Sequence, residues 1–354
     1  MEPSRRTGRV VVLAACVAPI ALVAACDEPT VPALKAGLVG EGNFDDHTYN
    51  RLVYDGCVRA AEDFGLELDF AIAPPGASAG YIDGLAATSD HVVTISFLMG
   101  DATRAAALAH PDVHFAILDY QYTDYPPNLS SYQFREDQGG YLAGTVAGLV
   151  VAGDPSPDVA CLGGLEIPAI KRFCNGFAHG ARRVCPGCAT PIRFTSSFDA
   201  PDEGIAAADE LIAQGADVIF GAGGFTGSAG IHHAAGRGVW VIGVDQDEFF
   251  STFGGGADPG APQLLTSLLK RTDRAAYASI RSTRLGTFAP GAITLATADG
   301  AFALAPYHAT AERITPSMQA EIDRVLAGLR DGTLDTGVDP QTGDPIAAAP
   351  GAGP

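Results

Sequence analysis

The sequence contains 354 residues, with 22 Lys and Arg against 41 Asp and Glu, and its formal net charge is −19. A negative charge of this size repels polyanions at long range, so the composition excludes a protein that mainly binds nucleic acid. Glycine contributes 43 residues and tryptophan only one, which is typical of an α/β protein rather than of a disordered chain or a coiled coil. The length predicts two domains.

Residues 1–26 predict a lipoprotein signal peptide. Three arginines precede an almost entirely apolar run over residues 10–25, which is shorter than a typical membrane-spanning helix. Small residues lead directly into Cys26, as in a bacterial lipobox, where the cysteine is acylated and becomes the mature N-terminus. The alternative is a plain secretory signal or an N-terminal anchor. Residues 27–35 follow as a short tether.

An exported protein enters an oxidising compartment, where one or two disulfides are expected. Cys161, Cys174, Cys185 and Cys188 are the expected participants, and the sequence leaves their pairing open. Cys57 lies in an apolar helical pattern and is predicted to be a buried free thiol. The short Cys-Pro-Gly-Cys motif follows a helix instead of joining a strand to a helix, which argues against redox catalysis.

Alternating strands and helices fill the first part of the chain. Apolar strands that are bounded by turn residues and separated by helices predict a parallel sheet with both faces covered. The expected strands cover residues 36–39, 66–73, 91–97 and 113–119, and the expected helices cover residues 47–64, 78–88, 101–109 and 134–151.

A second series of similar size follows the first. Its expected strands cover residues 159–162, 192–194, 217–220 and 239–244, and its helices cover 169–184, 202–214 and 226–236. A long helix at 263–285, two short strands at 293–297 and 301–304, and a helix at 316–330 complete it. We therefore expect an α/β fold with two doubly wound parallel-sheet lobes, a hinge and an interlobe cleft. The first lobe would comprise residues 36–145 and 264–292, the second 146–263 and 293–331, and a disordered tail 332–354.

Candidate binding residues lie near the carboxyl ends of the predicted strands, where open α/β sheets bind their ligands. Both halves contribute aromatic rings and carboxylates, although each residue also has an ordinary reading as a core ring, a helix cap or a solvated lysine. The first half offers Phe44, Asp45, Asp46, Phe97 and Asp119, the second Phe198, Gly224 and Asp245, and the predicted long helix adds Lys270.

These side chains suit a flat ligand that carries hydroxyl groups. Phe44 and Phe198 can stack on the two faces of a planar ring. Asp119 can accept a hydrogen bond from an N–H of a heterocycle, and Asp245 can accept two from vicinal hydroxyls. We therefore expect each lobe to supply half of one binding site.

Residues 42–50 resemble the Gly-x-Phe-Asn-Asp-x-Ser-Phe-Asn signature of the basic membrane protein family, the purine-nucleoside-binding lipoproteins of bacterial ABC transporters. The resemblance covers about residues 36–330, and the family is similar in fold to type I periplasmic binding proteins. Further matches follow in the family's order at residues 101–102, 110–119, 140–144, 175–181, 221–224, 243–247 and 266–270.

Carried over by position, the resemblance implies that Phe44 and Phe198 sandwich a purine base and that Asp119 binds the edge of that base. It implies a monomeric receptor without catalytic step, cofactor or metal, which delivers its ligand to an ABC permease. The remaining implied roles are ribose binding by Asp245 and Lys270, a backbone contact from Gly224, and shaping of the first loop by Asp46 and Asn50.

The sequence departs from the family pattern at two positions beside the expected site. Asp45 stands where the family usually has Asn, and His47 stands where Lys or Gln is common. The extra carboxylate leaves a sugar or a riboflavin-type compound as an alternative ligand. A dinucleotide-dependent enzyme is a remote alternative, since residues 221–227 follow a strand but lack the G-x-G-x-x-G spacing.

Overall fold

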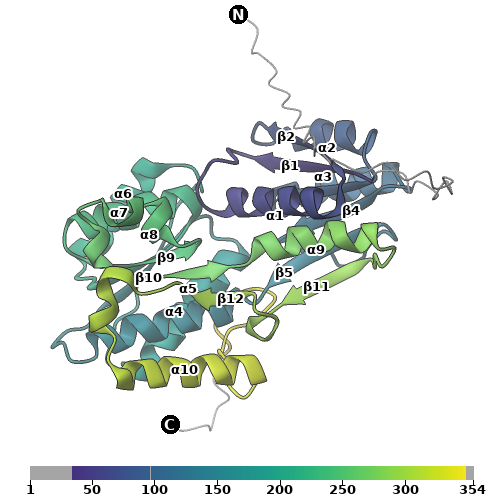
Figure 1. Ribbon diagram of the computed structural model, residues 1–354. Helices are drawn as coiled ribbons and strands as arrows, with labels where there is room; N and C mark the ends of the chain where they lie inside the picture. The colour runs from purple at the N-terminus through teal and green to yellow at the C-terminus, as the bar shows by residue number, and fades with distance from the viewer. Residues whose placement is uncertain (1–33, 96, 348–354) are drawn as a thin grey trace, which may run out of the picture.

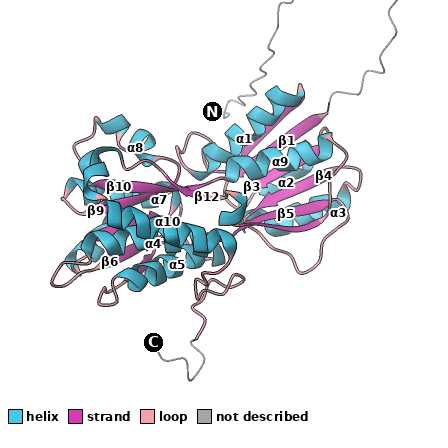
Figure 2. Cartoon of the chain, turned by 60° about the horizontal axis from the view of Figure 1, so that its bottom comes forward, coloured by secondary structure: helices cyan, strands magenta, loops and turns pink. Residues whose placement is uncertain are grey.

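The computed structural model describes residues 34–95 and 97–347, and its strands form two six-stranded sheets. The strand order is β11-β5-β4-β3-β1-β2 in the first sheet and β12-β10-β9-β8-β6-β7 in the second. Neighbouring strands are parallel, except that β12 runs antiparallel to β10. Figures 1 and 2 show one lobe around each sheet, with the strands layered between helices.

The first lobe contains the first sheet, with α1 and α9 on one face and α2 and α3 on the other (Figure 1). Alternate side chains of a strand point to opposite faces, so Leu38 and Val93 join the α1 side while Val39 and Val92 join the α2 side. The elements are β1 (Lys35–Glu41), α1 (Tyr49–Phe64), β2 (Glu67–Ala73), α2 (Ser78–Ala86), β3 (His91–Ile95), η1 (Phe97–Met99), α3 (Gly100–Ala109), β4 (His114–Leu118), β5 (Leu129–Phe134), α9 (Thr272–Arg284) and β11 (Gly291–Leu295).

The second lobe contains the second sheet and the closely packed helix pair α4 and α5. Its helices are α4 (Glu136–Val151), α5 (Pro168–Val184), α6 (Pro201–Ala213), α7 (Gly224–Gly236), α8 (Glu248–Ser251) and α10 (Pro316–Asp331). Its strands are β6 (Val159–Gly163), β7 (Ile192–Phe194), β8 (Val218–Ala222), β9 (Trp240–Asp245), β10 (Leu264–Lys270) and β12 (Phe302–Leu304).

The chain passes between the lobes after β5, after β10 and after β11, and these crossings form the hinge. The amide of Arg135 donates to the carbonyl of Leu295 at 2.9 Å, and the amide of Thr297 donates to Oε1 of Gln138 at 2.9 Å. Two crossings are thus hydrogen-bonded to each other. The predicted two-lobed architecture is confirmed.

The first part of the predicted helix at 263–285 is wrong. The predicted lobe boundaries are wrong as well, because this segment belongs to the second lobe. Leu264–Lys270 is the strand β10, which pairs with β9 and β12 in the second sheet, and the helix α9 begins only at Thr272. Both faces of β10 are covered and its sequence, LLTSLLK, does not alternate between apolar and polar residues, so periodicity could not distinguish it from a buried helix. Helix α4 also packs in the second lobe, and the predicted boundary at residues 292–293 falls inside β11.

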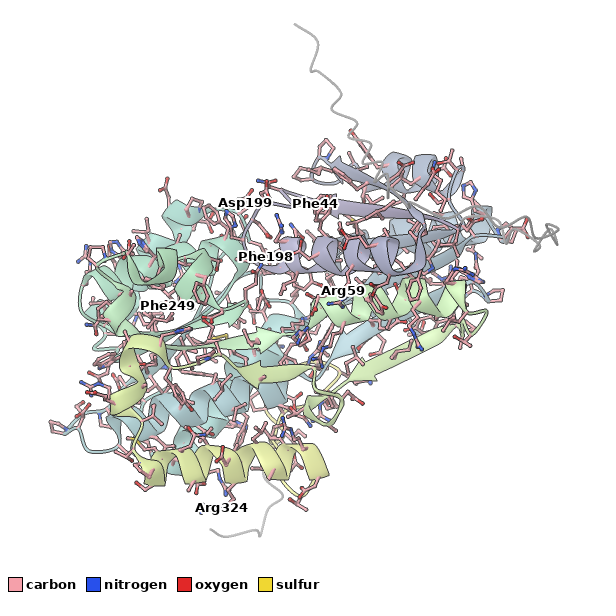
Figure 3. All side chains as sticks on the ribbon, viewed as in Figure 1. Phe44, Arg59, Phe198, Asp199, Phe249 and Arg324 are labelled. Carbon is pink, nitrogen blue, oxygen red and sulfur yellow. A yellow bond between two sulfur atoms is a disulfide. The ribbon has the colours of Figure 1, made fainter. Side chains whose placement is uncertain are left out.

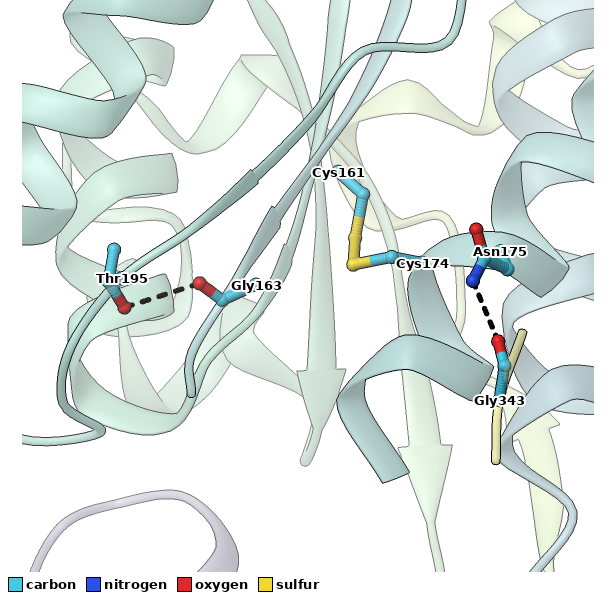
Figure 4. Close-up of a disulfide and its surroundings, with 6 residues drawn as sticks. All are labelled: Cys161, Gly163, Cys174, Asn175, Thr195 and Gly343. Carbon is cyan, nitrogen blue, oxygen red and sulfur yellow. Dashed lines mark hydrogen bonds between the residues drawn. A yellow bond between two sulfur atoms is a disulfide. The ribbon is translucent and has the colours of Figure 1, made fainter. Parts of the chain in front are cut away.

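The predicted disordered tail is wrong for residues 332–347, which pack on α5. The Asn175 side chain donates to the carbonyl of Gly343 at 2.7 Å (Figure 4), and the Arg172 guanidinium donates to the carbonyl of Pro340 at 3.1 Å. The backbone of Val338 forms an isolated antiparallel β-bridge with Pro345, and the side chain of Val338 is buried. The sequence of this segment is rich in Asp, Pro and Gly because it makes tight turns on α5.

Both disulfides come from the predicted set of cysteines. Cys161 in β6 is bonded to Cys174 in α5, which ties the sheet to its covering helix (Figure 4), and Cys185 is bonded to Cys188 in the loop after α5. Cys57 is buried and free, as predicted. No helix in the described part of the chain is long and apolar enough to cross a membrane. The predicted signal peptide and Cys26 lie outside the described residues.

Candidate functional site

A cavity of about 590 Å³ lies between the lobes, within the size range of small-molecule sites. The first lobe contributes the loop after β1, the start of α1, and η1. The second lobe contributes the loops after β6, β7, β8 and β9. Figure 3 shows Phe198 and Asp199 at the boundary between the lobes. The walls are largely apolar, with Ile167, Ile170 and Phe173 on the side of α5.

A buried ion-pair network around Lys270 lies at the inner end of this cavity. Lys270 ends β10 in the second lobe, and its Nζ donates to Oδ2 of Asp119 at 2.7 Å and to Oε1 of Glu136 at 2.8 Å. Because Asp119 belongs to the first lobe, this ion pair joins the lobes. The Lys270 ammonium also lies 4.6 Å from the ring centroid of Phe134. Lys270 is 2% exposed, so its charge depends on these partners.

Glu136 connects Lys270 to a second buried cation. Its Oε2 accepts a hydrogen bond from Nε of Arg172 at 2.5 Å, and Arg172 also holds the tail through Pro340. Burial alone would raise the pKa of Glu136, but Arg172 and Lys270 together hold that pKa below its usual value. Both residues were missed in the sequence analysis. Glu136 was missed because β5, which precedes it, was not recognised as a strand, and Arg172 lies within the helix α5, away from any strand end.

Asp119 and Asp245 occupy equivalent positions in the two lobes, at the carboxyl ends of the third strands of their sheets: Asp119 directly follows β4, and Asp245 is the last residue of β9. Both have a left-handed backbone conformation, with φ values of +62° and +66°. Such a conformation is costly for a residue other than glycine, and it is found where the surroundings hold a side chain in place at a functional site. Both side chains line the cavity.

Both carboxylates still have hydrogen-bonding capacity. Oδ1 of Asp119 is buried and has no hydrogen-bond partner among the described residues. Asp245 is 7% exposed, and no described side chain or amide donates to it. Burial raises the pKa of Asp245 to about 7, because the nearby ammonium of Lys270 only partly offsets the desolvation and the charge of Asp119 adds to it. Burial likewise raises the pKa of Asp119.

The loop after β1 is folded by its own polar side chains. The carboxylate of Asp46 accepts from the amides of Thr48, Asn50 and Arg51 at 2.9–3.0 Å, so it caps the start of α1. The Asn50 side chain donates to the carbonyl of Glu41 at 3.1 Å. Asp46 and Asn50 thus line the cavity, but their side chains already form hydrogen bonds within the loop.

Asp45, the departure from the family pattern, lies at the outer edge of the cavity. Its side chain is 71% exposed and forms an ion pair with Arg51 at 2.8 Å. The loop after β1 also accepts a hydrogen bond from the second lobe. The side chain of Gln246 donates to the carbonyl of Thr48 at 2.8 Å. The loop therefore contacts both lobes.

Phe44 does not lie in the cavity wall, where its predicted role would place it. Its ring is 6% exposed, stacks on Tyr54 with centroids 5.5 Å apart, contacts the edge of Phe70, and does not line the cavity. The ring packs directly on Gly40 of β1, where a Cβ would lie 2.6 Å from it. The missing side chain of Gly40 therefore leaves the space that Phe44 fills in the core.

Tyr49 and Phe97 are the aromatic residues that line the cavity from the first lobe. Phe97 was predicted, and Tyr49 was missed although it belongs to the same loop motif as Phe44. In the second lobe, Phe198 lines the cavity and packs over Gly164, where a Cβ would lie 2.3 Å from its ring. Gly224 also lines the cavity and has a φ of +59°.

A family model described as "ABC transporter substrate-binding protein PnrA-like" matches residues 33–296. The chain belongs to this family. Basic membrane protein A of Borreliella burgdorferi is 28% identical over 221 residues, which cover 61% of this chain and 64% of that protein, just under two thirds of its length. The CD4+ T-cell-stimulating antigen of Listeria innocua is 31% identical over 271 residues, which cover 71% of this chain and 73% of that protein. The predicted membership in the basic membrane protein family is confirmed.

Solved structures of solute-binding proteins share the fold of this PnrA-like protein. One from Aeropyrum pernix matches with a TM-score of 0.75 at 21% identity, covering 85% of this chain and 92% of that one. A carbohydrate transporter solute-binding protein from Agrobacterium radiobacter, solved with D-arabinose, matches with a TM-score of 0.58 at 16% identity and covers 83% of this chain and 100% of that one. These matches confirm the predicted type I periplasmic binding protein-like fold.

Proposed function

We propose that this PnrA-like protein captures a purine nucleoside in the cavity between its lobes and delivers it to the permease of an ABC importer. The observation that carries the proposal is a pair of carboxylates that are 9% and 7% exposed, Asp119 from the first lobe and Asp245 from the second, in a cavity with largely apolar walls. Carboxylates accept hydrogen bonds, so they fit a ligand with N–H groups at one end and hydroxyls at the other. The protein would act outside the cytoplasm as a monomer anchored through a lipid on Cys26.

The charges of the cavity support an uncharged ligand. Among the described residues that line it, Lys270 and the exposed His47 are the basic ones, and both Asp119 and Glu136 already bond to the Lys270 ammonium. A phosphate or carboxylate group would face Asp119 and Asp245, and no lysine or arginine among the described lining residues is free to neutralise it. Phe198 provides an aromatic face for a base, Asp119 would accept from the edge of that base, and Asp245 would accept from the ribose hydroxyls.

Calorimetric titration of the ligand-free protein with inosine, guanosine, adenosine, riboflavin and ribose tests this proposal. We expect saturable binding of at least one nucleoside, and loss of that binding in Asp245→Asn. Asp199→Asn is the matched control, because Asp199 lines the same cavity from an exposed position. Binding of ribose or riboflavin without any nucleoside would reject the ligand assignment.

Binding of a nucleoside near pH 6 should release a proton from Asp245. Its pKa is about 7 in the ligand-free protein, so the carboxyl is largely protonated at that pH. Ribose hydroxyls that donate to the ionised form would lower this pKa and expel the proton. Calorimetry in buffers with different ionisation enthalpies measures the release, which should vanish above about pH 8.

The same residue should affect stability in the absence of ligand. The folded-state pKa of about 7 lies above the ordinary aspartate value of 3.8, so the native state binds an extra proton between these two pH values. Stability should therefore fall as the pH rises from about 4 to about 7, and Asp245→Asn should remove this part of the slope. The charges of Asp119, Asp46 and Glu248 also raise the pKa of Asp245. The difference between the unmodified protein and Asp245→Asn therefore gives the part of the pH dependence that comes from Asp245 itself. A fall in stability between pH 4 and pH 7 that is equally large in Asp245→Asn would contradict this assignment.

A further inference from the structure

The hydroxyl of Tyr49 is a polar group in the cavity wall that the proposed function leaves unused. Tyr49 is the first residue of α1 and lines the cavity. Its Oη is shielded from solvent and has no hydrogen-bond partner in the described part of the chain. The ammonium of Lys270 lies 5.3 Å from the centroid of the ring and helps to hold it in place. A buried hydroxyl without a partner is unfavourable unless a ligand completes its bonding.

The hydroxyl lies beside a second group of the same kind. Asp119 lies close enough for its carboxylate to raise the pKa of the Tyr49 phenol by its charge and by a hydrogen-bonding interaction. No bond with full hydrogen-bond geometry joins the two groups, and Asp119 Oδ1 also lacks such a partner among the described residues. Burial, and then the charge of Asp119, raise the pKa of Tyr49 well above its usual value, so the phenol keeps its proton. The wall therefore presents a donor, Tyr49 Oη, next to an acceptor, Asp119 Oδ1.

We propose that Tyr49 determines specificity by donating a hydrogen bond to an acceptor atom on the edge of the base, while Asp119 accepts from the adjacent N–H. This inference rests on the proposed nucleoside function, in which Asp119 accepts a hydrogen bond from the edge of the base. Tyr49 adds a hydrogen-bond donor to the same edge. Hypoxanthine presents such an edge, with the O6 acceptor beside the N1–H donor. Unsubstituted purine carries neither of these groups, so in the same pose it leaves both protein atoms without a partner.

The test compares Tyr49→Phe with the unmodified protein for inosine and for purine riboside. Phenylalanine keeps the ring and removes only the hydroxyl. We expect the affinity for inosine to fall about tenfold, as for the loss of one hydrogen bond, and the affinity for purine riboside to stay within about twofold. Tyr54→Phe is the matched control, because Tyr54 lies on the same helix but outside the cavity lining, and it should change neither affinity.

An equal loss for both ligands would show a structural role for Tyr49 and overturn the inference, as would an unchanged affinity for inosine. Thermal unfolding of both variants identifies any loss that comes from misfolding, and we expect their melting temperatures to match that of the unmodified protein. If the unmodified protein binds no purine nucleoside at all, the proposed function fails and this inference fails with it, whereas binding of adenosine without inosine overturns this inference alone. The titration of the unmodified protein thus separates the two failures.

Discussion

Replacing Lys270 with methionine should abolish ligand binding and lower the free energy of unfolding by about 3–5 kcal/mol. Methionine keeps the length of the side chain and its contact with the ring of Phe134. It removes the ammonium that bonds to Asp119 at 2.7 Å and to Glu136 at 2.8 Å. Buried carboxylates would then lose their shared cation, and Asp119 would bind a proton or turn away from the position in which it can hold a ligand.

Chemical denaturation and calorimetric titration measure the two effects, with Lys35→Met as the matched control. Lys35 also lies in a strand and pairs with an aspartate, Asp69, at 2.8 Å, but its side chain is 29% exposed. Exposed pairs contribute about 1 kcal/mol or less, so the control should fold and bind normally. If both variants behave alike, the ion pair between the lobes has no special role.

The position of Lys270 also explains why the tail matters for the cavity. Asp119, Lys270, Glu136 and Arg172 form a continuous chain of hydrogen bonds that ends at the carbonyl of Pro340. The side chains of Lys270, Glu136 and Arg172 are buried and that of Asp119 is 9% exposed, so each charge depends on the next for its balance. The ordered tail is therefore part of the support of the binding site, although it lies on the far side of α5.

The sequence was sufficient to locate the cleft. Parallel strands end at one edge of a sheet, so Asp119 and Asp245 could be placed there from their positions after two apolar runs. The same logic placed Phe97, Phe198 and Gly224 in the cavity wall, and the structure agrees. These predictions needed only the strand ends, which the turn residues mark in the sequence.

The rest depended on packing that the sequence does not encode locally. Phe44 and Tyr49 are five positions apart in one loop, and their orientation follows from the space above Gly40, which Phe44 fills. Lys270 lies in the cavity wall, but it was predicted on a helix, because β10 is covered on both faces and lacks the alternation of a half-exposed strand. The order of residues 332–347 depends on hydrogen bonds with α5, more than 150 residues away in the chain.

Replacing Gly144 with alanine should destabilise the second lobe by about 3 kcal/mol or more. Helices α4 and α5 approach so closely that a Cβ on Gly144 would lie 1.9 Å from the carbonyl oxygen of Phe177. A Cβ on Gly180 would lie 2.0 Å from the carbonyl oxygen of Tyr141, so the close contact is reciprocal. These obstacles are backbone atoms, which cannot rotate away, and the helices would have to separate. Their separation would also disturb Glu136 and Arg172, which join the same two helices.

Urea denaturation followed by far-UV circular dichroism measures this effect, with Gly84→Ala as the matched control. Gly84 lies in the helix α2, and a Cβ there would meet nothing within 4 Å. Alanine favours the helix by about 0.5–1 kcal/mol over glycine, so the control should be as stable as the unmodified protein or more stable. Opposite signs for the two substitutions would show that the glycines of α4 and α5 are required by close helix packing. A similar gain in both variants would show that α4 and α5 can separate at little cost.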